Sequence, residues 1–147
     1  MAVWRNTSNL MTMEERNTWH KKIYLWQLLN NKKNYFFIWM LNGVYSVALD
    51  NDLSNGKISG EIQELQDMQK QKPKEITMAN WWLLLSSVAY LVNTRKHQTI
   101  GDIKKFCKEY LKDYFSSIEK YIDSALWVLA EYKLLKGSDD LCANHWA

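Results

Sequence analysis

The residues best suited to bind a metal lie close to the C-terminus. Cys142 and His145 have the Cys-x-x-His spacing of half a zinc site, because thiolates and imidazoles are the ligands that zinc prefers. The second half is missing, since Cys107 and His97 stand alone in separate segments. The sequence therefore predicts no metal site, and nothing in it indicates another cofactor.

A second pair with catalytic side chains is Arg16 and His20, in the segment RNTWH. It resembles the Arg-Asn…His motif of HEPN-type ribonucleases, with a shorter spacing than that family uses, and this implies RNA cleavage that depends on His20. On a helix, residues four positions apart are also neighbours without any catalytic reason. The chain has no glycine-rich phosphate loop and no nucleophile arranged beside a base and an acid. A protein without enzymatic activity is favoured, and a HEPN-like ribonuclease is a weaker alternative.

Cations gather between residues 95 and 112, where six Arg or Lys residues stand against Asp102 and Glu109. Such a cluster can bind phosphates without reading a base sequence, because phosphate contacts position a protein but carry no base information. A solvated lysine face is the other interpretation. The candidate phosphate-binding residues are Arg95, Lys96, Lys104, Lys105, Lys108 and Lys112.

Aromatic residues are unusually frequent, with eight Trp, eight Tyr and four Phe. Trp is enriched among the residues that anchor protein interfaces, although it also fills hydrophobic cores. We expect Trp127, Trp146 and Trp4 to be exposed and to anchor a protein partner.

The elements that position these residues are predicted to be helices. Thr12 and Glu15 have the spacing of a capping box and predict a helix that ends near the segment NNKKN. Residues 35–49 are apolar nearly all round and predict a central buried helix. A buried strand over residues 35–41 is the alternative, because short apolar runs are ambiguous.

Further along the chain, a short amphipathic helix over residues 59–71 is expected to end before Pro73. Thr77 is predicted to cap a long apolar helix. The segment GDIKKFCKEYLKDYF predicts a helix with an apolar face and a lysine face. The last helix is expected to be capped by Ser116 and Ser117 and to run to Tyr132.

The order of these elements over residues 81–147 resembles that of a winged-helix domain. WWLLLSSVAYLV supplies the first helix, QTI a short extended piece, GDIKKFCKEYL the second helix and SIEKYIDSALWVLAEYKLLK the third. The segment LLKGSDDLCANHW supplies a minimal wing, with strands at 134–136 and 141–146 around a turn at 137–140. A plain helical bundle is the alternative architecture.

The winged-helix resemblance implies that one side of the third helix reads the major groove of DNA. Ser117, Lys120 and Ser124 lie on that side of the helix and are the candidates for contacts in the groove. Glu119 and Asp123 lie there too, and carboxylates are repelled by phosphates. Winged-helix domains also serve as protein-docking modules, and this composition favours docking.

Length and charge set the remaining expectations. A chain of 147 residues fits one domain, here a helical subdomain over residues 1–74 packed on a winged-helix-like subdomain over residues 75–147. The net charge of +3 is mild for a protein dedicated to nucleic acid. Two cysteines, no signal-peptide pattern and no apolar run long enough to span a bilayer predict a cytoplasmic protein without membrane contact.

The sequence thus predicts a mainly α, non-enzymatic binding protein that docks on a protein or a protein–DNA complex. In size and composition it is similar to phage-encoded inhibitors and adaptors that act on host proteins. The alternative is a winged-helix transcriptional regulator that binds DNA. Pairing of two copies is compatible with both functions.

Overall fold

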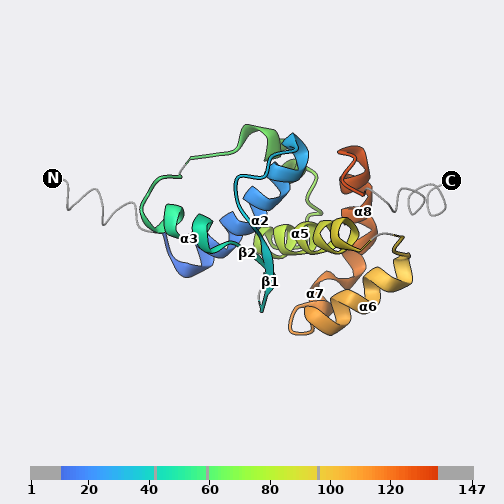
Figure 1. The fold of residues 1–147 in the computed structure, drawn as a ribbon. Coiled ribbons are helices and arrows are strands. Elements are labelled where there is room, and N and C mark those ends of the chain that lie inside the picture. The colour runs from blue at the N-terminus through green and yellow to red at the C-terminus, as the bar shows by residue number, and fades with distance from the viewer. Residues whose placement is uncertain (1–10, 42, 59, 96, 136–147) are drawn as a thin grey trace.

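The computed structural model describes residues 11–41, 43–58, 60–95 and 97–135 of the chain. Within these ranges the protein is mainly helical and contains one two-stranded sheet, which confirms the mainly α class. The long helix α5 runs through the middle of the molecule, with α2 on one side and α6, α7 and α8 on the other (Figure 1). Trp4, Trp146, Lys96 and the zinc half-site lie outside the described residues, as does most of the predicted wing.

Helix α2 spans Met13–Asn30 and begins as the sequence predicts. The Thr12 hydroxyl accepts a hydrogen bond from the Glu15 amide, and the Glu15 carboxylate accepts one from the Thr12 amide, both at 3.1 Å. This capping box satisfies two amides that have no partner inside the helix. The helix ends at Asn31, whose left-handed backbone (φ 51°) turns the chain toward the next segment.

Helix α5 spans Met78–Thr94 and is the centre of the core. The Thr77 hydroxyl caps it by accepting a hydrogen bond from the Asn80 amide, as predicted. Every residue from 81 to 89 is buried, because α2 and strand β2 pack on one side of the helix and α8 on the other. One hydrophobic cluster therefore joins side chains from both halves of the sequence.

The prediction of a buried helix over residues 35–49 is wrong, and the alternative of a strand within residues 35–41 is confirmed, although that strand is not buried. The chain forms β1 (Ile38–Met40) and β2 (Gly43–Tyr45), an antiparallel hairpin in which Ile38 lies opposite Tyr45 and Met40 opposite Gly43. Gly43 has φ +111°, which side chains with a Cβ rarely adopt, and it allows the tight reversal. Only the end of the segment is helical, as α3 (Val47–Ser54), capped by the Ser46 hydroxyl.

A short helical stretch precedes the proline, as expected. It consists of the 3₁₀ turn η1 (Gln63–Leu65) and α4 (Gln66–Lys70), and it ends before Pro73. Met68 of α4 is fully buried, and its carbonyl accepts a hydrogen bond from the Trp81 indole at 3.0 Å. The stretch is thus fixed to the start of α5.

The C-terminal helices are shorter than predicted. Helix α6 spans Ile100–Tyr110, and α7 (Phe115–Ile118), the 3₁₀ turn η2 (Glu119–Tyr121) and α8 (Ile122–Glu131) follow it. The expectation of one continuous helix capped by Ser116 and Ser117 is therefore wrong. No side chain caps α7, and both serines lie inside it. The 3₁₀ turn joins two segments whose ends, Ile118 and Ile122, are both buried.

Lys21 is the most unusual buried residue of α2, with only 6% of its surface exposed. Its ammonium donates to the Asn17 carbonyl at 3.1 Å, and no carboxylate pairs with it among the described residues. Gly43 lies against it, since a Cβ at that position would be 3.4 Å from Lys21 Cε. Burial lowers the pKa of Lys21 to about 8.

Candidate functional site

The hairpin exposes large apolar side chains on its first strand and on the residues just before and after it. Phe36, Ile38 and Met40 alternate with partly buried neighbours, as side chains do on the two faces of a strand. Phe36 is 81% exposed, and Leu41 at the end of the strand is 88% exposed. We call these four residues, Phe36, Ile38, Met40 and Leu41, the hairpin surface.

The opposite face of the hairpin is anchored by aromatic contacts. The Trp39 ring packs edge-on against Phe106 (5.2 Å between centroids) and against Tyr110 (6.4 Å), and it lies tilted on Tyr90 at 5.5 Å. Phe37 meets Tyr24 edge-on at 5.3 Å. Such pairs add to the stability gained from apolar burial. The strand is therefore held on α2, α5 and α6 while its outer face stays open.

Strand β1 also has an open edge. The sheet has two strands in the part of the chain that the structure describes, so β1 pairs only with β2. Natural edge strands are protected from unwanted pairing by short length, charges, prolines or bulges; β1 has only three residues, and residues 35–41 contain neither a charged residue nor proline. An exposed apolar face beside a free strand edge is typical of a surface that binds another protein.

The charges close to the hairpin in sequence are positive. Residues 31–49 include Lys32 and Lys33 and no acidic residue. The next acid, Asp50, is already engaged, because its carboxylate accepts hydrogen bonds from Arg16 and His20. The segment that carries the hairpin surface is therefore positively charged.

Helix α6 adds a basic face beside the hairpin. Thr99 and Asp102 form a capping box at its start, and their hydrogen bonds lower the pKa of the Asp102 carboxyl. Ile103, Phe106 and Cys107 are buried, while the lysines occupy the outer side. No ion pair with a carboxylate forms at these lysines within the described ranges. The exposed lysines of α6 and the turn after it are Lys104, Lys105, Lys108 and Lys112.

The other predicted nucleic-acid residues that the structure describes lie on four different elements. Arg95 is the exposed C-cap of α5, and Ser117 is exposed in α7. Lys120 is exposed in η2, 3.8 Å from the Glu75 carboxylate. Ser124 is half-buried in α8. The structure thus gathers the lysines of α6 on one face but distributes the remaining candidates over the surface.

Trp127 is the predicted protein anchor that the structure describes. It lies in α8 and is 49% exposed. Leu134 and Leu135, predicted to begin a wing strand, are buried and not part of a strand. The winged-helix resemblance stays a prediction, because the rest of the wing lies outside the described residues.

Arg16 and His20 meet at one carboxylate. Asp50 Oδ1 lies 3.1 Å from His20 Nε2 and 3.3 Å from Arg16 Nε. The Ser46 amide donates to His20 Nδ1, so Nε2 of the neutral ring carries the proton and donates it to Asp50. The His20 ring, stacked on Tyr45 at 4.5 Å, is 1% exposed, and burial lowers its pKa. Through hydrogen bonds at both ring nitrogens, His20 therefore joins α2 to the segment after the hairpin and to α3. The ribonuclease hypothesis stays a prediction.

Sequence reasoning missed the hairpin surface. A helical interpretation of residues 35–49 placed Phe36, Ile38 and Met40 in the core. One signal was present in the sequence, because Asn42-Gly43 between apolar runs is a strong short-range indication of a hairpin.

Comparisons with known proteins add no relative: no family model, no curated protein and no solved structure matches this chain. No helix in the described ranges has both the length and the apolar character needed to cross a membrane. The same ranges contain no group of three or more His, Cys, Asp or Glu residues placed to hold a metal ion. The surface geometry is therefore the feature that indicates a function.

Proposed function

We propose that this chain is a small, non-enzymatic binding protein that docks on another protein through the hairpin surface. The observation that carries the proposal is the row of large apolar side chains on a strand with an open edge. Large apolar groups that face solvent together are unfavourable unless a partner covers them. Docking of this kind is the mode of action of an adaptor or an inhibitor, and we place it in the cytoplasm.

The partner surface is expected to have an apolar centre and an acidic rim. Phe36, Ile38, Met40 and Leu41 require an apolar contact, which supplies most of the affinity. The lysines at positions 32 and 33, together with those of α6, favour carboxylates around it. Complementary charges at a rim raise the association rate more than the affinity, and salt weakens their effect.

The experiment is a pull-down from nuclease-treated cell extract with the wild-type chain and a variant carrying Ile38→Thr and Met40→Thr. Threonine suits a strand, so the variant removes apolar area without disturbing the hairpin. We expect a captured protein whose dissociation constant with the purified chain rises at least about 30-fold in the variant, as for loss of a central apolar anchor.

Two controls decide which surface is used. Trp127→Ala tests the predicted anchor on α8, and circular dichroism with thermal unfolding shows that each variant is folded. A partner that binds the hairpin variant as tightly as the wild type contradicts the proposal. A partner lost only with Trp127→Ala assigns docking to α8.

A second candidate function, a winged-helix regulator that binds DNA, is favoured by the basic face of α6. Three lysines of α6 and Lys112 in the turn after it are exposed and form no ion pair within the described residues, so they can bind phosphates. Electrophoretic mobility shifts at increasing salt test this function, with Lys104→Glu, Lys105→Glu and Lys108→Glu combined. A DNA shift that weakens steeply with salt and disappears in the variant supports DNA binding through this face. An unchanged shift in the variant shows that this face does not bind the DNA.

A further inference from the structure

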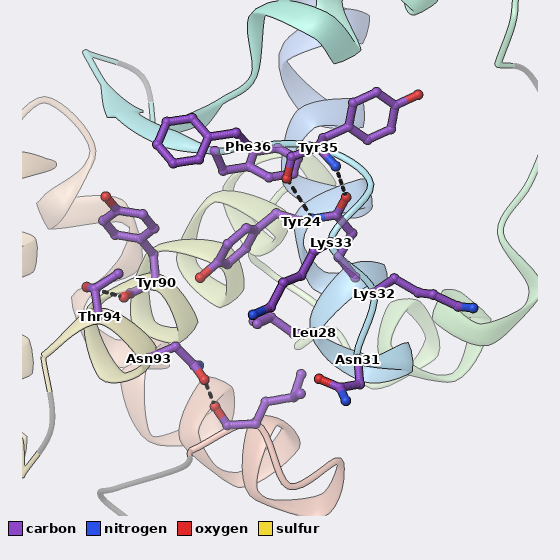
Figure 2. Close-up of a pocket in the computed structure, with 13 residues that line it drawn as sticks. Tyr24, Leu28, Asn31, Lys32, Lys33, Tyr35, Phe36, Tyr90, Asn93 and Thr94 are labelled. Carbon is purple, nitrogen blue, oxygen red and sulfur yellow. Dashed lines mark hydrogen bonds between the residues drawn. The ribbon is translucent and has the colours of Figure 1, made fainter.

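A pocket of about 440 Å³ lies between the C-terminal ends of α2 and α5, away from the outer face of α6. Figure 2 shows its walls, which come from α2, from the segment that leads into β1 and from α5. Tyr24, Phe37 and Tyr90 supply aromatic rings, and Phe36 stands at its rim. Volume and lining are those of a small-molecule site, which is mostly apolar with a few polar groups.

One polar group in this pocket, the Tyr24 hydroxyl, has no partner within the described part of the protein. Tyr24 is only 8% exposed, and its hydroxyl forms no hydrogen bond with any described residue. Burial and the neighbouring Tyr90 raise the pKa of Tyr24, so the phenol stays protonated and can donate. The hydroxyl oxygen itself is not fully buried, so it opens into the pocket and can pair with a bound ligand.

A second polar group has a fixed orientation. The Asn93 amide nitrogen donates to the Ala89 carbonyl at 2.7 Å and to the Leu134 carbonyl at 3.0 Å. Because both acceptors are carbonyls, they determine which end of the amide is nitrogen. The amide oxygen has no hydrogen-bond partner in the described part of the chain and is available to accept from a ligand.

The charge of the pocket is positive. Lys32 and Lys33 line it, and none of its lining residues is acidic. Figure 2 shows the Lys33 side chain reaching into the same space as the Tyr24 hydroxyl. No carboxylate pairs with either lysine among the residues described. A ligand that carries negative charge is therefore favoured.

The wall formed by the segment that leads into β1 is held in place by Gln27. Its side-chain amide donates to the Tyr35 carbonyl at 3.2 Å and accepts from the Tyr35 amide at 2.7 Å. Gln27 is 6% exposed, so this pair of bonds is shielded from water. The Tyr35 hydroxyl also donates to Asp52 at 2.6 Å. The pocket is thus formed before any ligand arrives, which lowers the cost of binding.

From these features we infer that the pocket binds a nucleotide, either free or as one unit of a single strand. The aromatic rings offer stacking or edge contacts to a base, as in single-strand binding proteins. The Tyr24 hydroxyl and the Asn93 oxygen provide a donor and an acceptor for the polar edge of that base. Lys32 and Lys33 bind the phosphate as point charges.

Isothermal titration calorimetry with AMP and UMP tests the site, with adenosine and ribose 5-phosphate as matched probes that lack the phosphate or the base. A half-open pocket of this size predicts a dissociation constant on the order of 10 to 100 μM for a nucleotide. We expect both partial ligands to bind at least about tenfold more weakly. Ribose 5-phosphate that binds as tightly as AMP and UMP overturns the inference, as does the absence of nucleotide binding at millimolar concentration.

Two variants assign the binding to this pocket. Tyr24→Phe removes one hydroxyl and keeps the ring against Phe37, and Lys33→Gln removes one charge. Each is expected to weaken nucleotide binding roughly three- to tenfold. Lys108→Gln, on the outer face of α6, is the control and leaves the dissociation constant unchanged.

A short single-stranded oligonucleotide distinguishes the two sources of the ligand. Tighter binding of the oligonucleotide than of AMP or UMP, with the same loss in Tyr24→Phe, identifies a strand contact. Equal or weaker binding identifies a free nucleotide. If neither ligand depends on Tyr24 and Lys33, the inference fails, whatever the outcome for the hairpin surface.

Discussion

Replacing Lys21 by methionine is expected to stabilise the protein. An ammonium buried without a carboxylate is destabilising, and this appears as the fall of the Lys21 pKa from 10.5 to about 8. That difference corresponds to about 3 kcal/mol at pH 7, where Lys21 is protonated in both the folded and the unfolded chain. Methionine keeps most of the apolar stem. It gives up the bond to the Asn17 carbonyl, which helix α2 already satisfies.

The net effect at pH 7 is a gain of about 2 kcal/mol, once some loss of packing is allowed for, or a rise in Tm of about 5 °C. The pH dependence is the sharper test. Between pH 8 and 10.5 the unfolded chain binds this proton more readily than the folded chain, so the wild type gains stability as pH rises. The advantage of Lys21→Met is therefore expected to shrink by about 1 kcal/mol between pH 7 and pH 9.

Urea unfolding followed by Trp fluorescence at the two pH values measures both quantities. The comparison with the wild type at each pH cancels the titration of tyrosines and Cys107. Lys70→Met, at an exposed position on α4, is the matched control and is expected to change stability by less than about 0.5 kcal/mol. A loss of stability in Lys21→Met at pH 7, or an equal gain at both pH values, would refute the reasoning.

Three further predictions concern other parts of the structure. Because burial lowers the pKa of His20, stability is expected to fall as pH drops below about 6.5, and this dependence should be weaker in His20→Asn when unfolding is followed from pH 7.5 to 5. Trp39→Ala removes the aromatic contacts under the hairpin and should cost about 2 to 3 kcal/mol in urea unfolding, whereas Met40→Thr on the outer face should cost less than about 0.5 kcal/mol. Burial raises the pKa of Cys107 to about 12, so peptide mapping after treatment with a thiol reagent at pH 8 should show it modified only in the unfolded chain.

The local signals in the sequence predicted the starts and ends of several helices well. Thr12 with Glu15, and Thr77, act through bonds to residues three positions away, so the pattern of letters contains the whole interaction. The same holds for Pro73, which lacks an amide hydrogen. The lysine face of α6 was predictable too, because helical periodicity separates it from the buried stripe.

The hairpin was not predictable from hydrophobic pattern, because both of its faces are apolar. Trp39 and Phe37 are apolar because they pack on the core, while Ile38 and Met40 are apolar although they face solvent. A strand that alternates between two apolar faces has no polar period, so it looks like a buried helix. The Asn42-Gly43 signal was local and specific, and it should have outweighed the composition.

The pocket could not be predicted from the sequence, because its walls come together only in the tertiary structure. Tyr24, Tyr90 and Leu134 are far apart in sequence, and they share a wall only because α2 and α5 pack side by side. The position of the Tyr24 hydroxyl in the pocket and the fixed amide of Asn93 are properties of that packing. A single sequence gives no indication of either.

Phe36 belongs both to the hairpin surface and to the rim of the pocket. A protein seated on this ring would lie across the mouth through which a small molecule enters and leaves. Residence time in the pocket would then lengthen once the complex has formed, even if no atom of the inner walls moved. Stopped-flow release of a fluorescent nucleotide, with and without the bound protein, would show this as a slower dissociation rate.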